Sequence, residues 1–170
     1  MLQIPNLVIF GQITVDDVVP ATPGIWRRLL GGNALYAAAG ARLVLSSDKI
    51  GIVSRIGRTT PIKVRKILDY AGIRHSISSI ENDILNDWIL YEEDGSRFSV
   101  PRNISIRRSS SETGINSEAY RHQLEAQSPT LNDMPPTWIK ANGFHLSPQV
   151  FSRHKKNYEA LKGNGFISLD

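Results

Sequence analysis

The sequence of 170 residues contains no cysteine and no apolar run long enough to cross a membrane. A chain without cysteine forms no disulfides and has no thiol chemistry, which favours a reducing cytoplasm. The first ten residues also lack the basic start and the small-residue cleavage site of a secretory signal peptide. We therefore expect a cytoplasmic protein without a membrane partner.

Charge of one sign is not concentrated anywhere in the chain. The formal net charge is +4, but the basic residues stand in short, separated groups. Because no stripe of Lys and Arg is interleaved with aromatic residues, we expect no nucleic-acid partner. The four histidines lie far apart, at spacings that suit neither metal ligation nor a catalytic dyad. We expect no metal site, and structural or surface roles for His75, His122, His145 and His154.

Two phosphate-binding patterns are missing as well. The chain has neither G-x-x-x-x-G-K-[ST] nor G-x-G-x-x-G, so neither a P-loop nor a dinucleotide-binding turn is predicted. The remaining composition, 41% hydrophobic and 21% charged, is that of an ordinary globular domain. Candidate chemistry is therefore concentrated in the first third of the chain.

Strands and helices are predicted to alternate at both ends of the chain. The apolar run Leu7–Phe10 and residues 49–53 are typical of strands buried on both faces. Helical spacing covers residues 34–45 and 62–70, and Gly72 stops the second helix. This order predicts right-handed βαβ units and an α/β fold. The same rhythm returns near the C-terminus, with helices at 118–126 and 152–161 and strands within 138–146 and at 165–169.

The middle of the chain has a different pattern. Residues 75–80, 87–91 and 97–100 are short strand-like runs, and the last two are joined by a turn-rich segment. We expect them to form a small antiparallel sheet. Residues 101–117 are polar and rich in serine, which predicts a long surface loop.

A glycine pair that leads into an alanine-rich helix is the most informative stretch. Gly31 and Gly32 allow the backbone or a ligand to come close, and Asn33 is a good N-cap residue. The helix start would then be bare, with free N–H groups and a positive dipole end that suit a small polar ligand. The alternative is that the pair forms only a tight turn and the alanines only allow close packing.

Asp16 is the candidate that would bind hydroxyl groups. It follows the carboxyl end of the first buried strand, where open α/β sheets place their ligands. A carboxylate there can accept two hydrogen bonds from vicinal hydroxyls. The alternative is that Asp16 and Asp17 are both solvated turn residues.

Seven segments follow one another in a recognisable order: residues 11–16, 31–32, 37–43, 49–57, 72–73, 88–95 and 145–148. Their succession resembles the ribokinase or PfkB family of carbohydrate kinases. The resemblance implies a three-layer α/β/α core with a small β-sheet lid, and ATP-dependent transfer of phosphate to a sugar or nucleoside hydroxyl. It also implies ATP and Mg²⁺ as cofactors, a substrate carboxylate at Asp16 and substrate contacts at Gly31 and Gly32.

The sequence departs from the family pattern at several positions. Tyr36 stands where the family often has asparagine, Gln12 replaces a frequent glutamate, and Arg58-Thr59-Thr60 follow Gly57 in place of two acidic residues. The G-A-G-D motif, which supplies the anion hole and catalytic aspartate of the family, does not occur. We therefore assign no catalytic residue and no metal ligand to this chain. The candidate substrate-binding residues are Asp16, Gly31, Gly32, Asn33 and Tyr36.

These observations favour one hypothesis over two alternatives. Residues 1–170 would form the N-terminal, substrate-binding part of a PfkB-like kinase, with lid strands near 13–30 and 75–100 and the C-terminal nucleotide-binding part absent. The alternatives are a non-catalytic sugar- or nucleoside-binding relative and an inactive remnant. The strand at 165–169 would leave the core incomplete and open to self-association at an exposed sheet edge.

Overall fold

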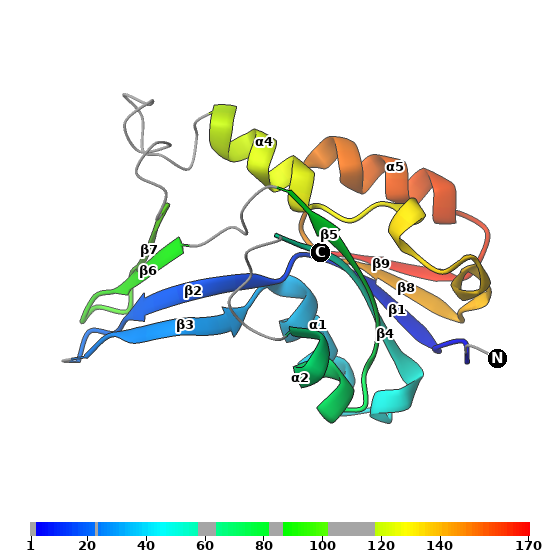
Figure 1. Cartoon of the computed structure of the whole chain (residues 1–170), viewed down its shortest axis with the longest axis horizontal. Coiled ribbons are helices and arrows are strands. Elements are labelled where there is room, and N and C mark those ends of the chain that lie inside the picture. The colour runs from blue at the N-terminus through cyan, green and yellow to red at the C-terminus, as the bar shows by residue number, and fades with distance from the viewer. Residues whose placement is uncertain (1–2, 23, 58–63, 82–86, 102–117) are drawn as a thin grey trace.

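A parallel sheet of five strands forms the centre of the computed structural model, which describes residues 3–22, 24–57, 64–81, 87–101 and 118–170 (Figure 1). Its strand order is β5-β4-β1-β8-β9. Within it, Leu7 of β1 pairs with Ile50 of β4 on one side and Gly143 of β8 on the other. The strands are β1 (Leu7–Phe10), β4 (Ile50–Gly57), β5 (Arg74–Ile80), β8 (Gly143–Leu146) and β9 (Phe166–Leu169).

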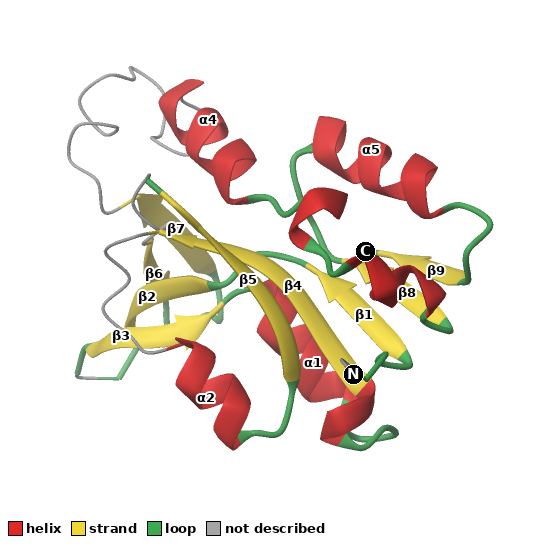
Figure 2. Ribbon diagram, turned by 45° about the vertical axis from the view of Figure 1, so that its right-hand side comes forward, coloured by secondary structure: helices red, strands yellow, loops and turns green. Residues whose placement is uncertain are grey.

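Helices cover both faces of this sheet (Figure 2). On one face lie α1 (Asn33–Ala41) and α2 (Val64–Tyr70), and on the other lie α4 (Glu118–Gln127) and α5 (Phe151–Leu161). The expected α/β class and the three-layer arrangement of the core are therefore confirmed. The described residues also include three short 3₁₀ helices: Ser47–Lys49, Leu131–Asp133 and Pro136–Lys140.

Strand alternation divides the apolar side chains between two cores. In β1, Ile9 belongs to the core under α1 and α2, whereas Val8 and Phe10 belong to the core under α5. All three side chains are completely buried. The continuous apolar run in the sequence therefore corresponds, as predicted, to a strand covered on both faces.

A second, smaller sheet extends from one end of the core, with strand order β3-β2-β6-β7 (Figure 1). Two antiparallel hairpins, β2–β3 and β6–β7, join through parallel pairing of β2 with β6. The prediction of an antiparallel sheet is thus wrong for its central pair. The strands are β2 (Thr14–Val19), β3 (Trp26–Gly31), β6 (Asp87–Tyr91) and β7 (Arg97–Pro101).

Two other predictions from the sequence need correction, and two segments lie outside the residues that the structure describes. Residues 75–80 belong to β5 of the central sheet, parallel to β4, and not to the small sheet. The first helix ends at Ala41, before the predicted end at residue 45. The polar segment 102–117 and residues 58–63 lie outside the described residues.

An ion pair connects β4, a strand of the central sheet, to the segment after α4. Arg55 Nε donates to Asp133 Oδ2 at 2.7 Å, and the Thr130 main-chain N–H and hydroxyl donate to the same oxygen, each at 2.8 Å. Burial raises the pKa of Asp133, but hydrogen bonds from Ser78, Thr130 and Arg55 outweigh it and hold the pKa below its usual value. The charged carboxylate therefore stabilises the fold at neutral pH.

We predict that Asp133→Asn lowers the free energy of unfolding by about 2 kcal/mol at pH 7, because a largely buried Arg55 loses its charged partner. Since the folded pKa is the lower one, this contribution is present above the unfolded pKa and is lost as the pH falls below about 4. Urea unfolding at several pH values measures it. Asp48→Asn, at a half-exposed carboxylate, is the control and should leave stability nearly unchanged. An effect of Asp133→Asn that stays constant down to pH 3 would contradict the assignment.

Candidate functional site

Gly32 packs directly against the chain that links β1 to β2. Its φ is 99°, and a Cβ atom placed on it would lie 2.4 Å from the Gln12 carbonyl oxygen and 2.8 Å from the Thr14 main-chain nitrogen. No side chain fits there without movement of the backbone. Glycine at this position therefore allows the start of α1 to meet the start of β2.

The start of α1 is not bare, in contrast to the prediction. The N-cap residue is Gly32, and Asn33 is the first residue of the helix. The Ala34 N–H donates to the Gln12 carbonyl oxygen at 3.2 Å, and the Leu35 N–H donates to the Gly32 carbonyl oxygen at 3.1 Å. Because the main chain already uses these donors, the helix terminus is not an open anion site.

Asn33 contributes to the site by holding three segments together. Its Oδ1 accepts a hydrogen bond from the Gln12 N–H at 2.8 Å, and its Nδ2 donates to the Pro148 carbonyl oxygen at 2.7 Å. The β1–β2 connection, the helix start and the loop after β8 are thereby fixed to one another. Asn33 is thus a positioning residue in this structure, and its predicted role as N-cap is wrong.

Polar side chains converge on Gly31. Asp16 Oδ2 accepts the Thr14 hydroxyl hydrogen at 2.8 Å. A Cβ atom placed on Gly31 would lie 3.0 Å from Asp16 Oδ2, 3.3 Å from Thr14 Oγ1 and 3.8 Å from the Tyr36 hydroxyl. The structure therefore brings Asp16, Gly31 and Tyr36 together, as the sequence indicated. Thr14 was missed, although its spacing of two residues from Asp16 on a strand could have revealed it.

The neighbouring carboxylate, Asp17, has a different environment. It is completely buried, and its Oδ1 accepts a hydrogen bond from the Arg28 N–H at 2.7 Å. Arg28 has a φ of 55°, and the pairing of β2 with β3 is irregular at this point. Asp17 therefore stabilises a β-bulge. Asp16, the preceding residue of β2, points to the other face of the strand and lies near Gly31.

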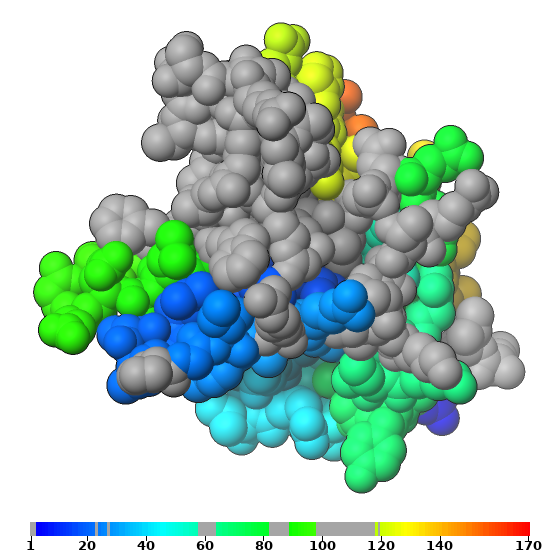
Figure 3. Space-filling model, turned by 60° about the vertical axis from the view of Figure 1, so that its left-hand side comes forward, coloured from blue at the N-terminus to red at the C-terminus, as the bar shows by residue number. Residues whose placement is uncertain are grey.

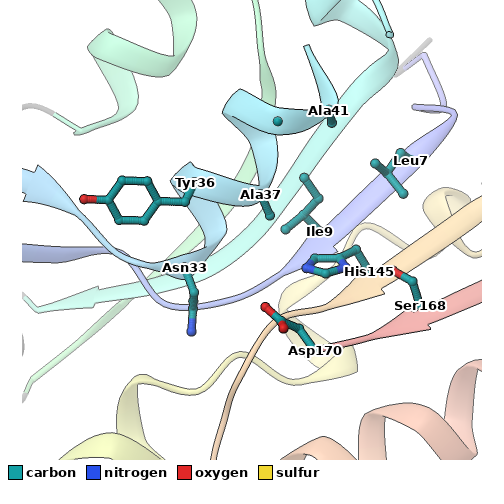
Figure 4. A pocket seen from close by; sticks show the side chains of 10 residues that line it. Leu7, Ile9, Asn33, Tyr36, Ala37, Ala41, His145, Ser168 and Asp170 are labelled. Carbon is teal, nitrogen blue, oxygen red and sulfur yellow. Dashed lines mark hydrogen bonds between the residues drawn. The ribbon is translucent and has the colours of Figure 1, made fainter. Parts of the chain in front are cut away.

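A pocket of about 510 Å³ lies beside this cluster, along the α1 face of the central sheet (Figure 4). Leu7, Ile9 and Ala37 give it an apolar floor, and His145, Ser168 and Asp170 line its other end. Asn33 and Tyr36 line it as well and connect it to the cluster at Gly31. This part of the sheet face is therefore accessible.

His145 and Asp170 are titratable groups of the pocket that sequence reasoning did not place in a site. The Nδ1 atom of His145 lies 2.7 Å from the Ser168 hydroxyl. Burial lowers the pKa of His145 below its usual value, while the Asp170 carboxylate acts in the opposite direction. A neutral ring at pH 7 can accept the hydroxyl hydrogen. His145 begins the segment 145–148 of the family resemblance, but only its place near the end of a strand could have suggested that it lines a pocket.

The described residues do not fit the nucleotide and metal that the resemblance implies. Among them, no group of three or more His, Cys, Asp or Glu side chains could hold a metal ion. At the helix start next to the glycine pair, the Ala34 and Leu35 N–H groups already donate to main-chain carbonyl oxygens. We therefore assign no residue of the described ranges to ATP or Mg²⁺.

No helix among the described residues is long and apolar enough to cross a membrane.

Comparison with solved structures identifies the architecture. Ribokinase from Giardia lamblia superposes with a TM-score of 0.67 at 15% identity, over 98% of this chain and 50% of that one. The Burkholderia thailandensis nucleoside kinase in complex with inosine gives 0.61 at 13% identity, over 96% and 52%. Ribokinase from Cryptococcus neoformans in complex with ADP gives 0.61 at 15% identity, over 97% and 50%. The chain has the ribokinase fold.

The extent of this similarity matters as much as its existence. The chain spans about half the length of the ribokinase-fold structures that it matches. No family model and no curated protein matches the sequence. The resemblance seen in the sequence is confirmed at the level of the fold.

The two glycines should differ in what a methyl group does to them. We predict that Gly32→Ala lowers the free energy of unfolding by more than about 2 kcal/mol, because the added Cβ overlaps the backbone at a positive φ. Gly31→Ala should fold with nearly unchanged stability, since its Cβ meets movable side chains. Urea unfolding of both variants measures the difference, and equal losses would contradict it.

Proposed function

We propose that this chain binds a sugar or nucleoside through vicinal hydroxyls and acts as the substrate-binding half of a ribokinase-type phosphotransferase. The convergence of Asp16, Thr14 and Tyr36 on Gly31 is the observation that carries the proposal. A carboxylate has several acceptor positions on its two oxygens, so Asp16 can accept hydrogen bonds from adjacent substrate hydroxyls in addition to that from Thr14.

Each residue of the cluster has a distinct part in this proposal. Asp16 accepts hydrogen bonds from the substrate, and Thr14 orients its carboxylate. Gly31 leaves room above the strand because a side chain there would approach Asp16. Gly32 and Asn33 fix the loop against β2 and do not themselves bind the ligand.

The solved structures of similar fold support this reading. They include a nucleoside kinase with inosine and a ribokinase with ADP, proteins about twice as long as this chain. We therefore assign phosphoryl transfer, ATP and Mg²⁺ to none of the described residues. Because phosphoryl transfer depends on positioning and charge stabilisation of the transferred group, the chain alone is expected to be inactive. The absence of cysteine favours the cytoplasm as its location.

Substitution of the adjacent carboxylates tests the proposal. Asp16→Ala should weaken binding of adenosine by about 2–3 kcal/mol, since charge-assisted hydrogen bonds are lost, and should leave the melting temperature unchanged. Asp17→Ala should lower stability by about 1–3 kcal/mol, because the Arg28 N–H loses its buried acceptor. Calorimetric titration and thermal unfolding measure the two effects.

The control is Asp94→Ala, a fully exposed carboxylate in the turn of the β6–β7 hairpin, which should alter neither property. Magnesium with ATP alone should not raise the melting temperature of the wild-type chain. Absent binding, or an equal loss of affinity from Asp16→Ala and Asp94→Ala, would overturn the proposed site. Saturable binding without any need for a second polypeptide would favour the non-catalytic relative.

We also propose that β9 is a pairing edge. Among the described strands it pairs only with β8, and its Phe166 and Leu169 side chains are 73% and 55% exposed. An open edge with apolar side chains is a template for another strand.

We expect the isolated chain to self-associate, and a Phe166→Lys, Leu169→Lys variant to be more monomeric. Charged side chains on an edge strand oppose edge-to-edge pairing. Light scattering after size-exclusion chromatography measures the mass of each. Leu43→Lys with Val44→Lys, at two exposed apolar positions outside the strands, is the matched control. A wild-type chain that elutes as a stable monomer at all concentrations would contradict this proposal.

A further inference from the structure

The irregular pairing of β2 with β3 determines which side chains share a face with Asp16. Asp16 pairs with Leu29 and Val18 pairs with Trp26, so Asp17 faces two residues, Arg27 and Arg28, across the ladder. Residues three apart in a regular strand point to opposite faces. The bulge adds one residue and thereby brings Trp26 to the same face as Leu29 and Asp16.

The bulge is held in place from the other face. Asp17 is buried there and accepts the Arg28 N–H, while Arg28 has a positive φ that non-glycine residues rarely adopt. A buried carboxylate and a strained residue thus keep Trp26 in its orientation. Strain of this kind persists only where the surrounding structure fixes it.

The result is an apolar wall next to a polar cluster. Trp26 is 56% exposed and Leu29 is 40% exposed, on the strand that pairs with β2. The space-filling view shows the β2–β3 hairpin (blue) at the surface beside the β6–β7 hairpin (green) (Figure 3). Two residues along β2, about 7 Å, separate Asp16 from the position that pairs with Trp26. That spacing suits a ligand with hydroxyls at one end and a flat ring at the other.

Tyr36 adds a second aromatic ring from the helix side. Its side chain is 73% exposed, and its hydroxyl lies near Gly31. In Figure 4 the ring points away from Leu7, Ile9 and His145. The position is also one at which this chain has an aromatic ring in place of the carboxamide expected from the family resemblance.

We propose that Tyr36, Trp26 and Leu29 make the site selective for nucleosides over free sugars. The inference rests on the proposed function: the ribose hydroxyls bind Asp16, whose carboxylate Thr14 orients, and the base lies against the aromatic and apolar side chains. Stacking between a base and an aromatic side chain contributes substantially to binding and requires no particular base. A free sugar would leave these apolar surfaces in water.

Calorimetric titration of the full chain with adenosine, ribose and adenine tests the proposal. Adenosine should bind at least about tenfold more tightly than ribose. Trp26→Leu should weaken adenosine binding about fivefold or more and leave ribose binding unchanged, and Tyr36→Leu should weaken adenosine binding more than ribose binding. Tyr36→Phe, which retains the ring, should keep most of the preference. Tyr70→Leu removes a tyrosine that is 96% exposed on α2 and should have no effect.

The outcomes separate this inference from the function on which it rests. Equal affinity for adenosine and ribose, or equal effects of Tyr36→Leu on both, would overturn the nucleoside preference and leave hydroxyl binding in place. Binding of none of the three ligands would overturn both. Adenine binding as tight as adenosine binding, with no effect of Asp16→Ala, would replace the inference with a site for a flat base alone. Circular dichroism confirms that each variant is folded, which is expected because the Trp26, Tyr36 and Tyr70 side chains are exposed and Asp16 is only partly buried.

Discussion

The site depends on the close contact between Gly32 and the backbone that joins β1 to β2. A Cβ atom at Gly32 would overlap the Gln12 carbonyl oxygen, so the contact exists only because this residue has no side chain. The contact places the beginning of α1 against the root of the small sheet. Asn33 then secures both to the loop after β8 through its two amide hydrogen bonds. Asp16 can face Gly31 and Tyr36 because this junction is rigid.

Most of the central fold was predictable because burial on both faces leaves a simple pattern. The continuous apolar run of β1 can only be satisfied between two helical layers. The run beginning at Ile50 gives β4 for the same reason. By contrast, β5 carries polar residues at Arg74, His75 and Ser76 and is only partly buried, so its composition resembled that of the small sheet. An edge strand of the main sheet has one free side, and sequence pattern does not separate it from a strand of a half-exposed sheet.

The candidate site was predictable in its residues more than in their roles. Asp16, Gly31 and Tyr36 meet in space, but Asn33, expected to cap the helix, uses its amide to join three segments. Local propensity indicated a cap, and tertiary hydrogen bonds gave the side chain a different use. The sequence offers only weak signals for Thr14 and His145: the spacing of Thr14 from Asp16 on one strand, and the place of His145 near a strand end. Strand register brings Ser168 to His145.

Asp16 and Asp17 show how two adjacent identical residues can lie in different environments. Alternation along β2 points them to opposite faces, and the buried one would be costly unless it accepted hydrogen bonds. The Arg28 N–H supplies one of these only because the backbone of β3 bulges there. The same bulge turns Trp26 toward the face of Asp16. The buried Asp17 carboxylate is therefore linked through the backbone of β3 to the shape of the face that Asp16 shares with Trp26, and a change at Asp17 would alter that face.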